Sequence, residues 1–366
     1  MNVKKIRAIG IGALVGIWAV LCIWNWVGSA QELSVSERRP LAQLPAITQQ
    51  SLLSGQWMKD FETYSLDQFP LRDSFRTLKS LSHYYVLNQS DNNDIYLADG
   101  YAAKLEYPLS RPSVEHALER FENLYQTYLQ GMDVTAAIVP DKGCYLAQEN
   151  GYPALDYGLL CQRMEQGMPW ATFVDLWDTL DVQDYYRTDT HWRQEQILEA
   201  AQRLCQALGA TQPVREDYTV TQLERPFYGV YYGQAALPMK PETMYILESP
   251  LLDACTVYDH ETGKTGKIYD MAKLESRDLY DVYLSGPKAL LTIENPNAKS
   301  DRELIVFRDS FGSAMIPLLV QEYATVTVVD IRYISSQQLE EYITFADQQV
   351  LFLYSTLLLN SSASLK

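Results

Sequence analysis

The tetrapeptide Arg-Asp-Ser-Phe occurs twice, at residues 72–75 and 308–311, and each copy places a serine hydroxyl beside a carboxylate. A serine can act as a nucleophile where a strand ends and a helix begins, because backbone N–H groups there can face a developing oxyanion. The second copy follows a β-rich run ending at Phe307 and precedes Gly312 and an apolar helical run. We therefore expect Ser310 to be the nucleophile.

The first copy has a different setting. It follows Pro70 rather than a strand, lacks an adjacent glycine and runs directly into a helical pattern. Asp73 or Ser74 is therefore expected to cap that helix, since short polar side chains accept hydrogen bonds from free N–H groups at a helix start.

A nucleophilic serine needs a base, and of the four histidines His191 has the most informative neighbours, in "YYRTDTHW". Asp189 stands two residues before it, so both side chains project to the same side of an extended chain. A carboxylate there can hold the imidazole Nδ1–H and leave Nε2 to accept a proton. Trp192 is expected to wall the pocket. The alternative is that Asp189 caps the following helix and His191 is an exposed loop residue.

The surrounding sequence predicts elements that would position these groups. A helical pattern over residues 57–86 is interrupted at Pro70, a hairpin turns at residues 99–100, and an amphipathic helix follows with Ser113 as its expected N-cap. Strand-like runs then alternate with helical patterns, which predicts a mostly parallel sheet covered by helices on both faces. Residues 210–285 break this rhythm and are expected to form an antiparallel, β-rich insertion or lid.

The N-terminal segment predicts a membrane anchor. Three basic residues (Lys4, Lys5 and Arg7) precede an uncharged run over residues 8–31, long enough to span a bilayer as a helix. The basic side would stay in the cytoplasm and leave the rest of the chain extracellular. The alternative is a signal peptide cleaved before Gln31. The predicted domains are 1–31 (cytoplasmic tip and transmembrane anchor), 32–55 (linker) and 56–366 (catalytic domain, with the insertion at about 210–285).

Composition limits the remaining classes. The net charge of −16 argues against nucleic-acid binding, which requires clustered basic residues. Four of the five cysteines follow the predicted anchor, where an oxidising environment would permit disulfides, although a buried free thiol is favoured for Cys205. The sequence contains no CxxC or HExxH motif, and we expect neither a metal site nor a cofactor.

Several segments resemble one known family. The stretches "DQFPLRD", "IVPDK", "TDTHW", "VFRDSFGSAMIPLL" and "VTVVDIRYI" look like those of the DHHW family of exported bacterial proteins. That family is similar to the periplasmic alginate O-acetyltransferases, whose catalytic domain is SGNH-hydrolase-like. The chain departs from the family pattern at Thr190, where the name implies histidine, and at Arg308, where the nucleophile motif has glycine.

The resemblance implies a fold and roles for individual residues. Ser310 would be the nucleophile, His191 the general base and Asp189 the group that orients it. The Asp-His block precedes the serine block, which a circularly permuted SGNH-hydrolase-like fold would explain. Together with the local patterns, this predicts an α/β protein with such a domain, an N-terminal transmembrane helix and the inserted β-rich segment.

Other residues are expected around the substrate. The Ser310 backbone N–H is the first candidate for an oxyanion donor, and Gly286 and Asn295 are weaker candidates. Arg332 is expected to line the pocket, and Arg308 to narrow it. The alternatives are a turn for Gly286 and a surface salt bridge for Arg332.

These observations favour acetyl transfer to an extracellular polysaccharide or cell-wall glycan through an acyl-serine. The family resemblance also implies a membrane-bound O-acyltransferase that supplies acetyl groups. The alternatives are an SGNH-type carbohydrate esterase and a non-catalytic, anchored glycan-binding or scaffold protein. Arg308 separates enzyme from binder, because a side chain that blocks Ser310 would favour binding without turnover.

Overall fold

The computed structural model describes residues 3–34, 36–210, 214 and 217–366. The chain forms two compact units. The first comprises Met1–Asn92 and Tyr232–Pro238, and the second comprises Asn93–Tyr231 and Met239–Lys366. The residue bounds of the domains expected from the sequence stay a prediction, and each unit is described by itself.

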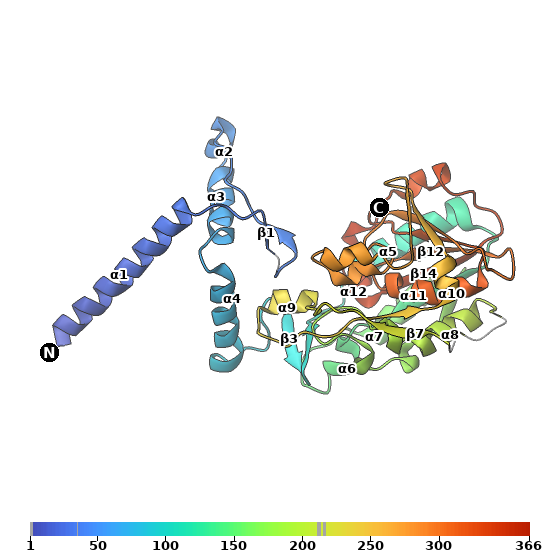
Figure 1. The fold of residues 1–366 in the computed structure, drawn as a ribbon, viewed down its shortest axis with the longest axis horizontal. Coiled ribbons are helices and arrows are strands. Elements are labelled where there is room, and N and C mark those ends of the chain that lie inside the picture. The colour runs from blue at the N-terminus through green and yellow to red at the C-terminus, as the bar shows by residue number, and fades with distance from the viewer. Residues whose placement is uncertain (1–2, 35, 211–213, 215–216) are drawn as a thin grey trace. The chain divides into compact units, whose positions relative to one another are not determined.

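The second unit is built on one central sheet, which includes β12 and β14 (Figure 1). It has eight described strands in the order β10-β9-β11-β13-β12-β14-β5-β6. Strands β13, β12, β14, β5 and β6 run parallel to one another, whereas β11, β9 and β10 pair antiparallel. The strands are β5 (Val134–Val139), β6 (Thr172–Val174), β9 (Thr256–Asp259), β10 (Lys264–Gly266), β11 (Leu290–Glu294), β12 (Glu303–Arg308), β13 (Thr325–Val329) and β14 (Gln349–Ser355).

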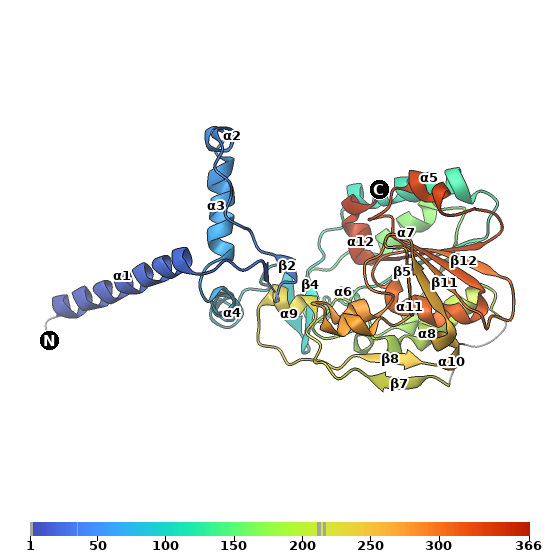
Figure 2. The same ribbon diagram turned by 45° about the horizontal axis from the view of Figure 1, so that its top comes forward.

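Helices cover both faces of this sheet, as Figure 2 shows. One face packs against α5 (Arg111–Leu124), α7 (Tyr157–Gly167) and α12 (Thr356–Asn360). The other packs against α8 (Leu198–Ala207) and α11 (Gly312–Leu319). Alternate residues of the central strands enter the two cores, as the period of two in a strand requires.

The fold prediction therefore needs correction. The sheet is mixed, with five parallel strands and three antiparallel ones, and residues 210–285 do not form a separate β-rich insertion. Strands β9 and β10 extend the main sheet, because the short turn at Gly263 allows an antiparallel pair. Among the described residues of this segment, only β7 (Thr219–Gln222) and β8 (Tyr245–Glu248) form a sheet apart from the main one. The short helices α9 (Val230–Ala235) and α10 (Pro250–Ala254) complete the described part of this segment.

The second unit also contains one hairpin and several short helices outside the main sheet. The hairpin of β3 (Ile95–Ala98) and β4 (Tyr101–Lys104) turns at residues 99–100, as predicted. Helix α5 begins with Ser110, not Ser113, at its N-cap, and the Ser110 hydroxyl accepts from the Ser113 N–H. Helix α6 (Gly143–Leu146) follows β5. The other short helices are Tyr125–Leu129, Trp177–Thr179, Val182–Asp184, Gln194–Gln196, Met271–Glu275, Leu279–Val282, Val320–Glu322, Ser336–Glu341 and Ser362–Ser364.

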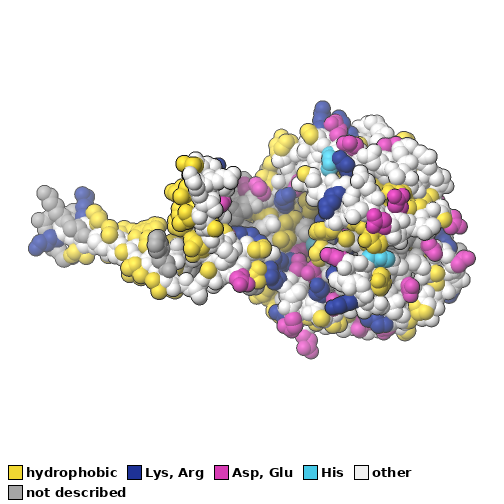
Figure 3. Space-filling model, turned by 90° about the horizontal axis from the view of Figure 1, so that it is seen from above, with side chains coloured by type: hydrophobic (Ala, Val, Ile, Leu, Met, Phe, Trp, Pro, Cys, Tyr) yellow, Lys and Arg dark blue, Asp and Glu magenta, His cyan; other side chains and the backbone are white. Residues whose placement is uncertain are grey.

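The N-terminal helix α1 (Val3–Val27) overturns the predicted membrane anchor. Across the part of the chain that the structure describes, no helix combines the length and the apolar character needed to cross a bilayer. The single-pass anchor and the location deduced from it are not supported, although α1 does carry exposed apolar side chains (Figure 3).

The first unit also contains β1 (Leu33–Ser34), β2 (Arg39–Pro40), α2 (Gln49–Leu53), α3 (Gln56–Asp67), α4 (Arg72–Leu81) and the helical turn Ser82–Val86. The first Arg-Asp-Ser-Phe copy opens α4, but Leu71, with a positive φ of 57°, occupies the N-cap. The predicted cap at Asp73 or Ser74 is therefore wrong. Asp73 instead accepts a hydrogen bond from the Ser36 hydroxyl at 3.1 Å.

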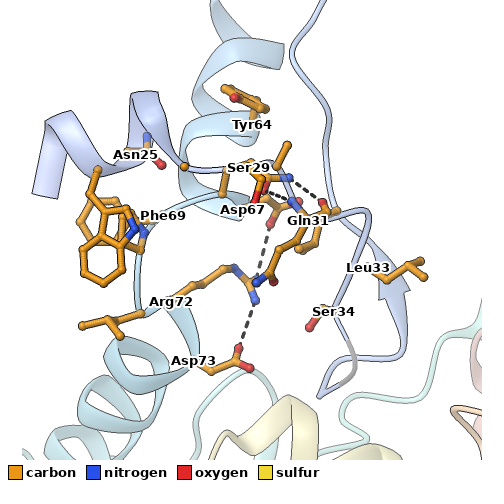
Figure 4. Close-up of a pocket in the computed structure, with 17 residues that line it drawn as sticks. Asn25, Ser29, Gln31, Leu33, Ser34, Tyr64, Asp67, Phe69, Arg72 and Asp73 are labelled. Atoms are coloured by element: carbon orange, nitrogen blue, oxygen red, sulfur yellow. Dashed lines mark hydrogen bonds and ion pairs between the residues drawn. The ribbon is translucent and has the colours of Figure 1, made fainter.

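A cavity of about 460 Å³ lies within this first unit (Figure 4). The figure shows Arg72 between two carboxylates. The guanidinium lies 3.5 Å from Asp67 and 3.6 Å from Asp73. Its lining includes none of the site residues predicted from the sequence. The ionic contacts satisfy the buried Asp67 carboxylate, and Arg39 gives it two further hydrogen bonds.

Candidate active site

Ser310 occupies the turn between β12 and α11, at the edge of the sheet where the parallel strands end. The neighbouring Asp309 carboxylate fixes this turn: it accepts from the Phe311 N–H at 3.0 Å and from the Ser355 N–H, at the end of β14, at 2.8 Å. Ser310 itself is partly exposed. The nucleophile turn is thus held rigidly while its hydroxyl stays accessible.

His191 and Asp189 complete a continuous chain of hydrogen bonds with Ser310. The Asp189 Oδ1 atom lies 2.6 Å from His191 Nδ1 and also accepts from the His191 N–H at 3.1 Å. On the other side of the ring, His191 Nε2 lies 2.8 Å from Ser310 Oγ. Asp189 is completely buried and His191 is 7% exposed, so little water competes for these contacts. The remaining Asp189 oxygen accepts from the Val230 N–H at 2.7 Å.

The loop that carries Asp189 and His191 is a tight hairpin rather than the start of a helix. Tyr185 and Trp192 form an antiparallel bridge, and the Tyr186 N–H donates to the His191 carbonyl at 3.1 Å. Helix α8 begins only at Leu198, so Asp189 does not cap it. The alternative of a helix cap beside an exposed histidine is wrong.

Two ionic groups, the half-buried Glu242 and the buried Lys142, support this loop. The Glu242 carboxylate accepts from the N–H groups of Arg187 and Thr188 at 2.7 and 2.8 Å. The Lys142 ammonium, at the end of β5, donates to the carbonyls of Ala102, Tyr186 and Arg187. Burial lowers the pKa of Lys142 to about 7, against the attraction of Asp189 and other carboxylates.

Trp192 has a different role from the predicted one. Its side chain is fully buried, and the indole Nε1–H donates to the Phe311 carbonyl at 3.0 Å. Its ring also packs edge-on against Phe311. Trp192 therefore connects the histidine loop to the nucleophile turn. Because its side chain is fully buried, it does not line a pocket as predicted.

Arg308 is fully buried and its guanidinium lies near the Gly286 carbonyl, at 3.3 Å, and Asp330, at 3.7 Å. Burial lowers the pKa of Arg308, while the Asp330 charge acts in the opposite direction. The side chain therefore does not project over Ser310, and the expected narrowing of the site does not occur. Gly286 reaches this cluster through its carbonyl and has a φ of 80°, so the turn alternative fits its backbone.

Arg332 forms a paired contact with Asp330, at 2.8 and 2.6 Å. Burial on its own would lower the pKa of Arg332, but the hydrogen bonds and charge of Asp330 raise it above the ordinary value. The side chain is 17% exposed, so this salt bridge is largely buried rather than on the surface. Its place at the end of β13 puts it on the same edge of the sheet as Ser310.

Asn295 does not belong to the site. It follows β11, which runs antiparallel to β13, and its N–H donates to the Ala324 carbonyl just before β13 begins. This is the edge of the sheet opposite Ser310, about a strand's length away. Its side-chain amide donates to the Val320 carbonyl at 3.2 Å. The prediction of Asn295 as an oxyanion donor is therefore wrong.

Tyr280 and Lys142 are site neighbours that the sequence analysis missed. The Tyr280 ring stacks on the His191 imidazole, with ring centroids 3.9 Å apart. Burial raises the pKa of Tyr280 well above the ordinary value, assisted by the charge of nearby acidic groups. Lys142 stands at the end of the segment "IVPDK", directly after a buried strand, and this position could have indicated a place near the site. Nothing in the sequence around Tyr280 indicated contact with His191.

The mixed sheet carries the serine-histidine-aspartate arrangement at the edge where its parallel strands end. The resemblance to the DHHW family is confirmed, because the family described as DHHW protein matches residues 177–329, a range that contains both Asp189 and Ser310. No curated protein matches the chain.

Solved structures share the fold. A DHHW family protein from Eubacterium siraeum aligns with a TM-score of 0.60 and 20% identity, over 74% of this chain and 93% of the other. Bacillus cereus PatB1 aligns with a TM-score of 0.55 and 19% identity, over 72% of this chain and 96% of the other. PatB1 with a sulfonyl adduct gives the same TM-score and identity, over 72% of this chain and 95% of the other.

Proposed function

We propose that the protein is an acyltransferase that moves an acetyl group onto a glycan hydroxyl through an acyl-serine at Ser310. The observation that carries this proposal is the hydrogen-bonded chain from Asp189 through His191 to Ser310, with both distances below 3 Å. The family resemblance supplies the substrate class, since the DHHW family is similar to alginate O-acetyltransferases. PatB1 has been solved with a sulfonyl adduct.

In the first half-reaction, Ser310 Oγ attacks the carbonyl carbon of the donor ester while His191 Nε2 takes the hydroxyl proton. Asp189 stabilises the imidazolium that forms and keeps the ring oriented. The carbonyl oxygen becomes an oxyanion, for which the Ser310 backbone N–H is the available donor. When the tetrahedral intermediate collapses, the leaving group takes the proton from His191 and the acyl group stays on Ser310.

The second half-reaction reverses these roles. A sugar hydroxyl gives its proton to His191 and its oxygen attacks the acyl-serine, so that an acetylated sugar leaves and Ser310 regains its proton. Water in place of the sugar would make the protein an esterase. The family resemblance also predicts a membrane-bound O-acyltransferase as the source of acetyl groups, and this partner stays a prediction.

The non-catalytic alternative depended on Arg308 covering Ser310. Arg308 is buried below the turn and held near Gly286 and Asp330, while Ser310 is partly exposed. An unobstructed nucleophile favours turnover over binding alone.

The test uses p-nitrophenyl acetate with the full chain. Wild-type protein should release p-nitrophenol, and intact-mass spectrometry should show one added acetyl group. Ser310→Ala should lose both signals, while Ser74→Ala, at the other copy of the tetrapeptide, should keep them. Equal rates for wild type and Ser310→Ala would contradict the proposal. Addition of candidate oligosaccharides then separates the two reactions, because only a transferase yields acetylated sugar.

A further inference from the structure

Arg308 occupies a position where the family pattern has glycine, two residues before the nucleophile. It is the last residue of β12, and its aliphatic part runs under the start of α11. A Cβ atom on Gly312 would lie only 2.8 Å from the Arg308 Cβ and 3.1 Å from its Cγ. The space below the nucleophile turn is therefore filled by the Arg308 side chain, and Gly312 permits that packing.

The guanidinium of Arg308 meets the nucleophile turn directly. Its Nη1–H donates to the Asp309 carbonyl at 3.3 Å and lies 3.7 Å from Asp330 Oδ2. Its Nη2–H donates to the Gly286 carbonyl at 3.3 Å. Asp330 is itself completely buried and fixed by Arg332. The Asp309 carbonyl, the Gly286 carbonyl and the Asp330 carboxylate thus determine the position of the Arg308 guanidinium.

The Asp309 carbonyl belongs to the same peptide group as the Ser310 N–H. In a trans peptide the C=O and N–H bonds point in opposite directions, so a contact that holds the oxygen also sets the direction of the N–H. The Gly312 N–H holds the same oxygen at 3.1 Å. The Ser310 N–H donates to no acceptor among the described residues, which leaves it available for an oxyanion.

A structural role alone explains this arginine poorly. The side chain is 0% exposed, and no described residue accepts a hydrogen bond from its Nε atom. Burying a cation costs several kcal/mol unless the ion is well paired, and apolar residues of similar volume often replace such groups without loss of stability. A charged donor on a carbonyl, however, polarises the whole peptide group and strengthens its N–H as a donor.

We propose that Arg308 is a positioning residue that acts through the Asp309 carbonyl to aim and polarise the Ser310 N–H as the oxyanion donor. This inference rests on the proposed acyl transfer at Ser310 and deepens it. Arg308 would stabilise the transition state without touching the substrate. Its removal should therefore affect kcat rather than KM.

The test compares p-nitrophenyl acetate with p-nitrophenyl thionoacetate, in which sulfur replaces the carbonyl oxygen and accepts hydrogen bonds weakly. The variants are Arg308→Met, which keeps most of the volume, and Arg308→Lys, which keeps a cation. Removing an oxyanion donor typically costs roughly 10²–10³ in kcat, so misaiming one is expected to cost about tenfold or more. Arg308→Met should lose this factor on the oxygen ester, with little change in KM.

The ratio of oxygen-ester to thionoester rates is the decisive measurement. It should fall in Arg308→Met and fall less in Arg308→Lys, because a merely structural defect would slow both substrates equally. Arg302→Met is the matched control. It removes an arginine that also binds backbone carbonyls, at the opposite end of the same strand, and should leave the ratio unchanged.

The outcomes separate this inference from the proposed function. A wild-type protein that forms no acetyl-Ser310 contradicts the proposed function. An active wild type whose Arg308 variants keep the wild-type rate ratio overturns the role of Arg308 alone. Thermal unfolding shows whether Arg308→Met folds. If it does not fold, the ratio of oxygen-ester to thionoester rates in Arg308→Lys decides the question instead.

Discussion

The imidazole of His191 lies flat against the ring of Tyr280, with the centroids 3.9 Å apart and the planes inclined by 9°. The Tyr280 side chain is 4% exposed, and its hydroxyl has no hydrogen-bond partner among the described residues. The ring therefore limits how His191 can tilt away from Ser310 and shields the imidazole from water. The unpaired hydroxyl adds nothing to this support.

The first prediction separates the ring from the hydroxyl. Tyr280→Phe should keep kcat within about threefold and unfold at the same or a higher temperature, because an unsatisfied buried polar group typically costs about 1–3 kcal/mol. Tyr280→Leu removes the flat support and should lower kcat by tenfold or more. Rates and thermal unfolding of the two variants measure this difference. A large loss of kcat in Tyr280→Phe would show instead that the hydroxyl contacts the substrate.

A second prediction concerns the orientation of His191. In Asp189→Asn the side chain can present an NH₂ group to Nδ1, which favours the tautomer that cannot take a proton at Nε2. We expect kcat to fall by about 10⁴, the loss typical for this change in a serine-histidine-aspartate triad. Asp175→Asn, outside the site, is the control. If Asp189→Asn retained most of its activity while folded, the carboxylate would not serve as the orienting group.

The local sequence was sufficient to locate the three central residues. The strand, turn and helix around Ser310 are contiguous, and Asp189 and His191 are two positions apart, so the relevant geometry is short-range. The family resemblance then connected the two segments. Their actual meeting at 2.8 Å depends on which strands are neighbours, which no local pattern determines.

The errors have long-range causes. Asn295 follows a strand, as Ser310 does, but β11 runs antiparallel to β12 and delivers its end to the opposite edge. The direction of the Arg308 side chain depends on Asp330, which arrives from the end of β13. The anchor was predicted from the length of the uncharged N-terminal run, whereas no described helix meets the requirements for crossing a bilayer.

A third prediction tests the contact between Gly229 and the histidine loop. A Cβ atom at this position would lie 2.2 Å from the Thr188 carbonyl carbon and oxygen, which are backbone atoms that cannot rotate away. Gly229→Ala should therefore displace the segment next to Asp189 and reduce both stability and kcat. Overpacking of this kind typically costs about 1–3 kcal/mol.

Gly158→Ala is the matched control for this substitution. Gly158 lies in α7 with only an ordinary contact at 3.8 Å, so alanine there should stabilise the protein by about 0.5–1 kcal/mol through helix propensity. Denaturant unfolding of both variants measures the difference. Equal stability of the two would mean that the Thr188 backbone can move without cost.

The last prediction concerns the buried ammonium of Lys142. Its three hydrogen bonds go to backbone carbonyls, no carboxylate of the described residues pairs with it, and its pKa falls from the ordinary 10.5 to about 7 because of burial. Between these two values the unfolded chain binds more protons than the folded one at this residue. The free energy of unfolding contributed by Lys142 should therefore increase with pH in that window, by at most about 1.4 kcal/mol per pH unit.

The measurement is the difference in unfolding free energy between wild type and Lys142→Met from pH 6 to pH 10. This difference should be flat below pH 7, where both states are protonated, and should shift in favour of wild type above it. Subtraction removes the contribution of every other titrating group, and Lys299→Met, at an exposed lysine, should show no such slope. A difference that stays constant to pH 10 would mean that the carbonyls of Ala102, Tyr186 and Arg187 keep the ammonium charged throughout. Lys142 would then hold the histidine loop as a permanent cation.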